Sequence, residues 1–133
     1  MAENTGEWKN NFGGQYFYQI NTIFWLSRYA YGLGFPSSFL GGNILKIDIQ
    51  LKSIVRVWED PKCIATEPLF IPAPSLAVED NEEDGVLIFV CHGTDEASLE
   101  TSLVVLDTEL EELGRFRAPV PTTIGIHGIW IPN

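Results

Sequence analysis

Residues 85–91 read Gly-Val-Leu-Ile-Phe-Val-Cys, and this continuous apolar run decides the fold class. A run of this length between polar segments is typical of a β-strand, because a buried helix needs a longer apolar segment. The run contains no alternation of apolar and polar residues, which predicts that both faces of the strand are buried.

Similar short segments flank this run on both sides. Upstream, residues 43–49 and 53–58 are rich in β-branched side chains and are separated by a few polar residues, which predicts a β-hairpin. Downstream, residues 101–106 and 113–118 predict a second pair of strands, joined by a connection at residues 107–112 that has room for one helical turn. Further short strands are predicted at residues 28–34, 67–72 and 125–131.

The predicted strands number about eight, with turns about every 8–12 residues. No substantial helix is predicted, so the fold class is all-β, and the pattern fits either a sandwich or a propeller. A distance of about 45 residues between successive groups of strands fits propeller blades, but this pattern does not choose between the two folds. Residues 1–15 are polar and are predicted to be a flexible lead-in.

The composition limits the classes of partner. The chain has 133 residues, of which 45% are apolar, enough for one domain with a buried core. It carries 18 acidic and 8 basic residues, for a net charge of −10. A negative chain without a Lys/Arg cluster repels phosphate groups, which argues against nucleic acids and anionic membrane surfaces as partners.

The cysteines and the apolar segments bear on the location of the chain. Cys63 and Cys91 are the two cysteines, neither lies in a CxxC motif, and such isolated cysteines predict no disulfide framework. The start of the chain lacks the basic and apolar regions of a signal peptide. The apolar stretch 23–40 is interrupted by Arg28 and Pro36 and is too short to span a bilayer. A cytoplasmic protein is therefore predicted.

Two side chains are candidates for metal chemistry. His127 lies between apolar neighbours, and Gly125 and Gly128 allow other groups to approach its ring. Imidazole is a common metal ligand, but a lone histidine on an apolar strand is more often a core or edge residue. Glu67 lies in an apolar segment flanked by prolines, where a carboxylate must be exposed or paired. It could accept the N–H of a metal-bound imidazole.

Other candidates carry weaker signals. His92 follows the apolar run and is interpreted as a turn residue. Cys91, His92 and His127 could meet at a metal, but their spacing is not typical of a zinc site. The acidic loop 79–85 can be compared with an EF-hand calcium loop. If such a loop began at Asp80, Gly85 would occupy the position that requires glycine, but Cys91 would occupy the position of the calcium-binding glutamate. A solvated loop is therefore favoured. The sequence has no nucleophile elbow, P-loop or dinucleotide-binding motif.

Several segments, taken in order, resemble segments of the carotenoid cleavage oxygenases. Residues 28–34, RYAYGLG, are similar to Y-R-Y-A-Y-G-L-G in the animal members of that family. Residues 67–74, EPLFIPAP, resemble S-E-P-x-F-V-P-x-P, and residues 127–132, HGIWIP, resemble H-G-L-F-x-P. The animal type includes the β-carotene oxygenases and the retinoid isomerase of the eye. Further matching segments are residues 17–21, 45–48, 57–61, 82–87, 103–107 and 112–115.

The resemblance implies a seven-bladed β-propeller, of which residues 16–133 would form the C-terminal portion, about two blades. In this family, a non-haem Fe(II) is held by four histidines from different blades, and dioxygen is used to cleave a polyene double bond into two carbonyls. His127 matches the last of the iron ligands. Glu67 matches a glutamate that orients an iron-bound imidazole by accepting its N–H.

Two departures from the family pattern bear on activity. Tyr16 stands where the family has a second glutamate, and a phenol is neutral at pH 7. Tyr18 replaces a proline of the same motif. The other three iron ligands would lie upstream of Met1, and His92 matches none of them. The chain by itself is therefore expected to retain no iron and to cleave no carotenoid, and its status as an enzyme is left open.

Three hypotheses on function remain. In the first, the chain is the C-terminal part of an oxidoreductase of carotenoid or retinoid metabolism. Its reactants would be dioxygen and a carotenoid or apocarotenoid. Its protein partner would be the upstream part of the same enzyme, and any membrane contact would be made by the full-length protein. In the second, the chain is a non-catalytic relic that acts as a binding or regulatory module. In the third, it is an unrelated all-β interaction domain with coincidental motifs.

Overall fold

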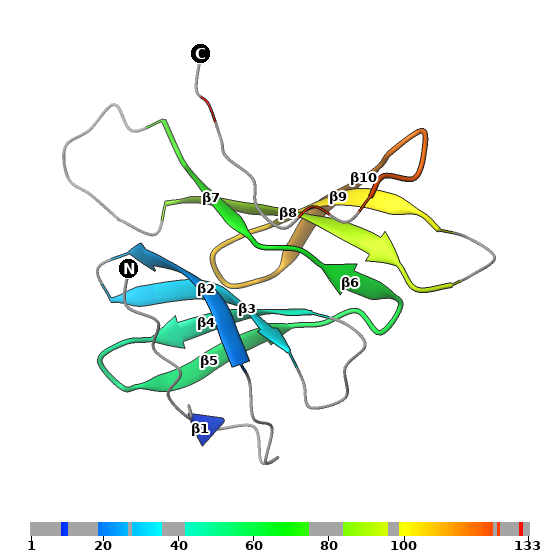
Figure 1. Ribbon diagram of the computed structural model, residues 1–133. Helices are drawn as coiled ribbons and strands as arrows, with labels where there is room; N and C mark the ends of the chain where they lie inside the picture. The colour runs from blue at the N-terminus through cyan, green and yellow to red at the C-terminus, as the bar shows by residue number, and fades with distance from the viewer. Residues whose placement is uncertain are drawn as a thin grey trace.

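The computed structural model describes residues 9–10, 19–26, 28–35, 42–74, 84–95, 99–123, 125 and 131. These residues contain ten short strands and no helix, and the strands form two sheets (Figure 1). The predicted all-β fold class is confirmed. The described part of the chain also contains no helix that is long and apolar enough to cross a membrane.

The first sheet, called sheet I, has the strand order β1-β5-β4-β3-β2. Neighbouring strands are antiparallel except β1 and β5, which are parallel. The turn between β4 and β5 is stabilised by Asp48, whose Oδ1 accepts the N–H of Leu51 at 3.0 Å. The predicted hairpin over residues 43–58 is confirmed. The strands are β1 (Lys9–Asn10), β2 (Gln19–Leu26), β3 (Tyr29–Phe35), β4 (Asn43–Asp48) and β5 (Ser53–Trp58).

The second sheet, called sheet II, is built around β8, the longest strand (Gly85–Gly93). Strand β9 pairs with one edge of β8, and both β6 and β7 pair with the other edge. In the turn between β9 and β10, the Asp107 Oδ1 atom accepts the N–H groups of Glu109 and Glu111, each at 2.9 Å. The remaining strands are β6 (Cys63–Ala65), β7 (Leu69–Pro72), β9 (Thr101–Leu106) and β10 (Glu112–Arg117).

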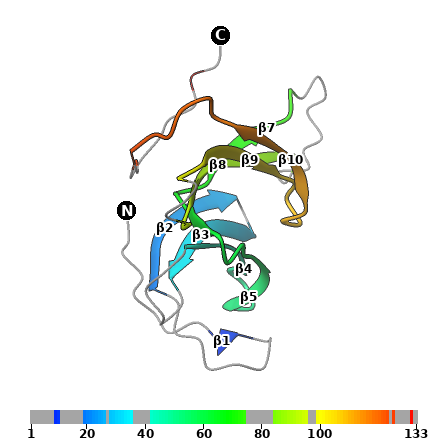
Figure 2. The same cartoon turned by 90° about the vertical axis from the view of Figure 1, so that its right-hand side faces the viewer.

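The main hydrophobic core lies between the two sheets, which Figure 2 shows as two layers. The rings of Trp58 from β5 and Phe89 from β8 meet edge to face, with centroids 4.8 Å apart. Burying large side chains of this kind stabilises the fold by about 1.5–3 kcal/mol each. The other buried members of this core are Tyr31, Leu33, Ile44, Cys63, Ala65, Phe70, Leu87, Cys91, Val104, Leu106 and Leu110.

The turn between β9 and β10 fastens sheet II to sheet I. The hydroxyl of Tyr31 donates to the carbonyl oxygen of Thr108 at 2.9 Å. The Nζ atom of Lys46, on β4, lies 2.5 Å from Oε1 of Glu109. These contacts join residues far apart in the chain, so the two sheets pack in one fixed arrangement.

Two sheets packed face to face are compatible with neighbouring propeller blades, and no closed propeller is present within the described residues. Of the predicted last strand, residues 126–130 lie outside the described part, whereas Gly125 and Ile131 are described and belong to no strand. Within the predicted flexible lead-in, residues 9–10 form β1.

The burial of β8 differs from the prediction of a strand buried on both faces. Leu87, Phe89 and Cys91 face sheet I and are buried, whereas Ile88 and Val90 are only partly buried. The reason is that the opposite face of sheet II, called the outer face, is only partly covered. Strand β6 was not predicted at all, because its three residues are too few to carry a period.

Candidate functional site

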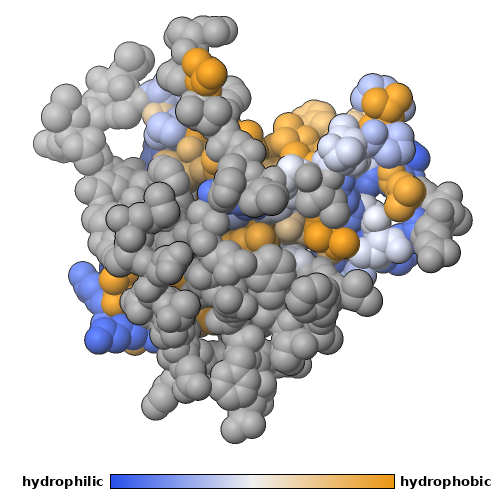
Figure 3. Space-filling view, viewed as in Figure 1, coloured by the Kyte–Doolittle hydropathy of each residue, from blue (hydrophilic) through white to orange (hydrophobic). Residues whose placement is uncertain are grey.

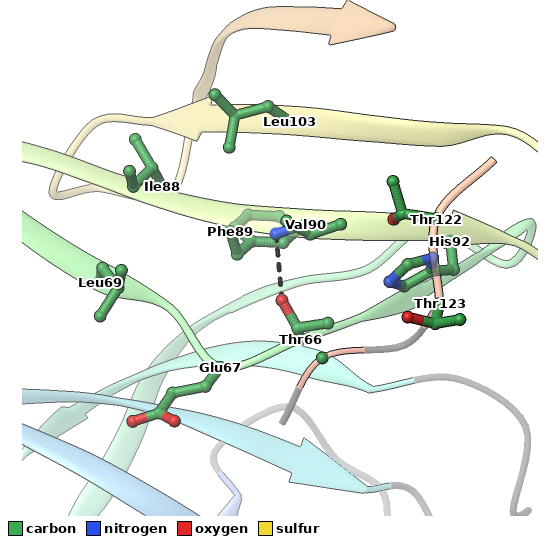
Figure 4. Close-up of a pocket in the computed structure, with 11 residues that line it drawn as sticks. Thr66, Glu67, Leu69, Ile88, Phe89, Val90, His92, Leu103, Thr122 and Thr123 are labelled. Atoms are coloured by element: carbon green, nitrogen blue, oxygen red, sulfur yellow. Dashed lines mark hydrogen bonds between the residues drawn. The ribbon is translucent and has the colours of Figure 1, made fainter. Parts of the chain in front are cut away.

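A pocket of about 210 Å³ opens on the outer face of sheet II (Figure 4). Its walls come from the link between β6 and β7, from β8 and β9, and from the segment that follows β10. The lining combines apolar side chains with a few polar groups, as is typical of ligand pockets. The lining residues are Thr66, Glu67, Leu69, Ile88, Phe89, Val90, His92, Leu103, Thr122, Thr123 and Gly125.

Glu67 lies in the link between β6 and β7 and not in the strand that the sequence predicted, because β7 begins at Leu69. The link is held against β8 by two hydrogen bonds. The N–H of Thr66 donates to the carbonyl oxygen of Val90 at 2.9 Å, and the N–H of Val90 donates to the Thr66 hydroxyl at 3.0 Å. Figure 4 shows the Glu67 carboxylate turned away from His92. The two hydrogen bonds of Thr66 hold the backbone next to Glu67 against β8.

Thr101, at the start of β9, anchors the segment that follows β10. Its carbonyl oxygen accepts the N–H of Ala118 at 2.7 Å. Its hydroxyl oxygen accepts the N–H of Thr122 at 2.9 Å and the hydroxyl of Thr122 at 3.4 Å. A single residue thus holds the segment across the outer face of sheet II, and this segment continues to Gly125 in the pocket wall.

His92 is a buried strand residue, so its interpretation as a turn residue was wrong. It lies on β8, directly opposite Thr101, with only 7% of its surface exposed. Its Nδ1 atom is 3.5 Å from the Thr101 hydroxyl, and its Nε2 atom has no hydrogen-bond partner within the described residues. Burial lowers the pKa of His92, which keeps the imidazole neutral at pH 7.

His127 and Tyr16 lie outside the described residues, as do residues 79–83 of the acidic loop. The ligand role of His127 therefore stays a prediction. Gly125, which lines the same pocket as Glu67, precedes His127 by two residues. The structure thus brings Glu67 into one pocket with the segment that leads to the predicted iron ligand.

The residues described do not make up a complete iron site. No group of three or more His, Cys, Asp and Glu side chains that could hold a metal occurs among them. Neutral imidazole and carboxylate suit iron, but Glu67 and His92 alone supply too few donors to hold it.

The two cysteines form a disulfide bond, contrary to the expectation from their spacing. Cys63 on β6 and Cys91 on β8 have Cα atoms 5.6 Å apart, within the usual range. Side chains alternate along a strand, so Cys91 faces the core while His92 faces the pocket. A metal site that combines Cys91 with His92 is therefore wrong. Pairing of β6 with β8, which the sequence did not reveal, is what brings the cysteines together.

Comparisons with known proteins bear on the identity of the chain. A family model described as retinal pigment epithelial membrane protein matches residues 19–132. The mitochondrial carotenoid-cleaving dioxygenase of Macaca fascicularis is 37% identical over 106 residues, which are 79% of this chain and 18% of the relative. The Homo sapiens protein of the same name is 36% identical over 106 residues, 79% of this chain and 17% of the relative.

A second group of relatives is similar at a comparable level. The beta,beta-carotene 15,15'-dioxygenase of Homo sapiens is 34% identical over 106 residues, which are 80% of this chain and 19% of the relative. The chain therefore spans only 17–19% of the length of these curated relatives.

Proposed function

Because the chain belongs to the retinal pigment epithelial membrane protein family, which includes the carotenoid dioxygenases, we propose that it is the C-terminal part of a non-haem iron dioxygenase. The substrate class is carotenoids or apocarotenoids, and the reaction is oxidative cleavage of a double bond with dioxygen. The upstream part of the same enzyme is the partner that would complete the active site, and we place the protein in the cytoplasm.

The proposed roles belong to two residues. His127 is a ligand of the Fe(II) ion, and Glu67 accepts the N–H of an iron-bound imidazole and so orients the ring. One observation carries this assignment. Glu67 and Gly125 line one pocket although they are far apart in the chain. Thr66, next to Glu67, and Thr122, three residues before Gly125, are each hydrogen-bonded to sheet II.

The isolated chain is proposed to be inactive. It has two histidines in all, and His92 is a buried residue of β8 on the outer face of sheet II. One imidazole, together with a carboxylate whose role is to orient an iron-bound imidazole, cannot hold iron tightly against water. The exposed apolar side chains of Leu113 and Phe116 on β10, an edge strand, are consistent with a chain that packs against further protein.

A complementation experiment tests this function. The chain is mixed anaerobically with Fe(II), alone and together with the upstream part of human beta,beta-carotene 15,15'-dioxygenase, and bound iron and cleavage products are measured. We expect neither tight iron nor product from the chain alone, and both from the mixture. His127→Ala should abolish iron retention by the mixture, while the exposed-site control Glu59→Gln should not.

Two outcomes would contradict the proposal. Near-stoichiometric iron and product from the chain alone would show that it holds a complete site. Full iron content in a mixture that carries His127→Ala would show that His127 is not a ligand. Failure of the wild-type mixture to assemble, with no iron bound, counts against the enzyme-fragment hypothesis.

The second candidate function is a non-catalytic binding module. The observation that favours it is the pocket itself. Its wall contains the buried Nε2 atom of His92, and the described residues include no complete metal site. Coding sequence upstream of Met1 discriminates between the two functions. Three further histidines on propeller-like strands favour the enzyme, and their absence favours the binding module.

A further inference from the structure

The Nε2 atom of His92 is a buried polar atom that the proposed iron chemistry does not use. The residue is 7% exposed, and no described group forms a hydrogen bond with Nε2. Buried polar atoms are nearly always paired, so an orphan in a pocket wall points to a partner that binds there. Figure 4 shows the ring of His92 beside Thr122 and Thr123, with its far edge toward Thr66.

The hydrogen bonds of Thr101 favour one tautomer of the His92 ring. The Thr101 hydroxyl oxygen accepts two hydrogen bonds, from the N–H and the hydroxyl of Thr122. A hydroxyl oxygen has two lone pairs, so both are occupied and the hydroxyl proton remains for donation. The Nδ1 atom of His92, 3.5 Å away, is in position to accept it. With Nδ1 as the acceptor, the neutral ring carries its own proton on Nε2.

The remainder of the pocket limits the kind of ligand. Leu69, Ile88, Val90 and Leu103 make most of the wall apolar. A volume of about 210 Å³ is below the range of drug-sized pockets, so the ligand is small. The Glu67 carboxylate lines the same pocket, and the chain has a net charge of −10, so an anionic ligand is repelled.

We propose that this pocket binds a small uncharged molecule with an apolar body and one oxygen acceptor, such as a ketone or an aldehyde, and that His92 donates its Nε2–H to that oxygen. The apolar body lies against Ile88 and Leu103, away from Glu67. Burial of the ring supports this arrangement, because it lowers the pKa of His92 and so maintains a neutral donor at pH 7. This site requires no iron and does not depend on the proposed dioxygenase function.

Imidazole ¹⁵N NMR on the whole chain tests the proposal directly, because the chain has only two histidines. We expect His92 to be neutral with its proton on Nε2, and cyclohexanone to shift its Nε2 signals saturably. Cyclohexanecarboxylate, which has the same ring but a negative charge, should bind more weakly. A proton on Nδ1 or no saturable shift with cyclohexanone would overturn the proposal.

Variants of His92 separate hydrogen bonding from pocket shape. His92→Phe retains an aromatic ring without a donor and should weaken cyclohexanone binding about tenfold, the effect of one lost neutral hydrogen bond. His92→Gln retains an N–H donor and should recover part of the affinity. Binding is followed by the ¹H–¹⁵N backbone signals of Val90 and Leu103, and circular dichroism checks the fold. Equal affinity in the wild type and His92→Phe, or tighter binding of the carboxylate than of the ketone, contradicts the assignment.

Discussion

At the scale of single residues, Lys46 shows how this fold accommodates a buried charge. Its side chain is only 3% exposed, and its Nζ atom lies 2.5 Å from Oε1 of Glu109 and 4.4 Å from the ring centroid of Tyr29. The ammonium group lowers the pKa of Glu109, chiefly through their hydrogen bond. Arg56, whose Nε is 3.3 Å from Glu109, contributes less because both side chains are more than half exposed.

Glu109→Gln should lower the free energy of unfolding at pH 7 by about 1 kcal/mol, because Lys46 would keep its burial but lose its anionic partner. The unfolded chain has the higher Glu109 pKa, so it binds the proton first as the pH falls. The ion pair therefore stabilises the protein above the pKa of the unfolded chain, about 4.5, and is lost as the pH falls through the lowered pKa of the folded state.

Urea denaturation at pH 7 and at successively lower pH values measures this effect. The difference between the wild type and Glu109→Gln should shrink on acidification. Glu111→Gln, an exposed site in the same turn, is the control and should change the stability by less than about 0.5 kcal/mol. A difference between wild type and Glu109→Gln that is constant with pH would show that the ion pair contributes nothing.

At the scale of elements, β6 is a short strand that depends on tertiary contacts. It has three residues, and its partner among the described strands is β8. The disulfide bond between Cys63 and Cys91 links these strands and closes a segment with a sequence separation of 28. Such a link restricts the unfolded chain, and the stabilisation it gives is typically about 2–4 kcal/mol.

The double variant Cys63→Ala/Cys91→Ala should therefore unfold about 2–4 kcal/mol more easily than the oxidised wild type. Dithiothreitol should destabilise the wild type by a similar amount and leave the double variant unchanged. Thermal unfolding with and without reductant makes this comparison. Two titratable thiols in the unreduced, unfolded wild type would show that no disulfide links β6 to β8.

At the scale of the whole molecule, sheet II exposes apolar side chains on its outer face and along β10, which pairs with β9 and has no second partner among the described strands. Phe116 lies opposite Leu103 on this sheet, with exposed fractions of 63% and 39%. Figure 3 shows hydrophobic surface over the upper half of the molecule, where Figure 1 places β8 to β10. Exposed apolar residues beside an open strand edge favour association with another chain.

Phe116→Lys should reduce concentration-dependent self-association, because it places a charge on the edge strand. Sedimentation velocity over a range of concentrations gives the readout. Leu51→Lys makes the same change in charge at an exposed leucine in the turn between β4 and β5, and it should leave association unaltered. Equal effects of the two variants would assign association to net charge and not to β10.

Several strands could be predicted because their residues alone carry a strand pattern. Residues 101–106 form β9 as predicted, and the hairpin of residues 43–49 and 53–58 forms β4 and β5. Strand β6 and the disulfide could not be predicted, because both depend on a partner strand that is distant in sequence. His92 was misjudged for the same reason, since its burial arises from Thr101 and the segment after β10.

The all-β class and the family could be predicted from the linear chain, because β-branched strand patterns and the order of motifs are properties of the sequence. It also singled out Glu67 and His127 as candidates for the iron site. Three other features depend on tertiary contacts: Glu67 shares a pocket with Gly125, Cys63 meets Cys91, and His92 is buried with its Nε2 atom unpaired within the described residues. The physical reason is that a side chain's burial and partners depend on which strands pair and how sheets stack, and these contacts join residues whose separation in sequence carries no local signal.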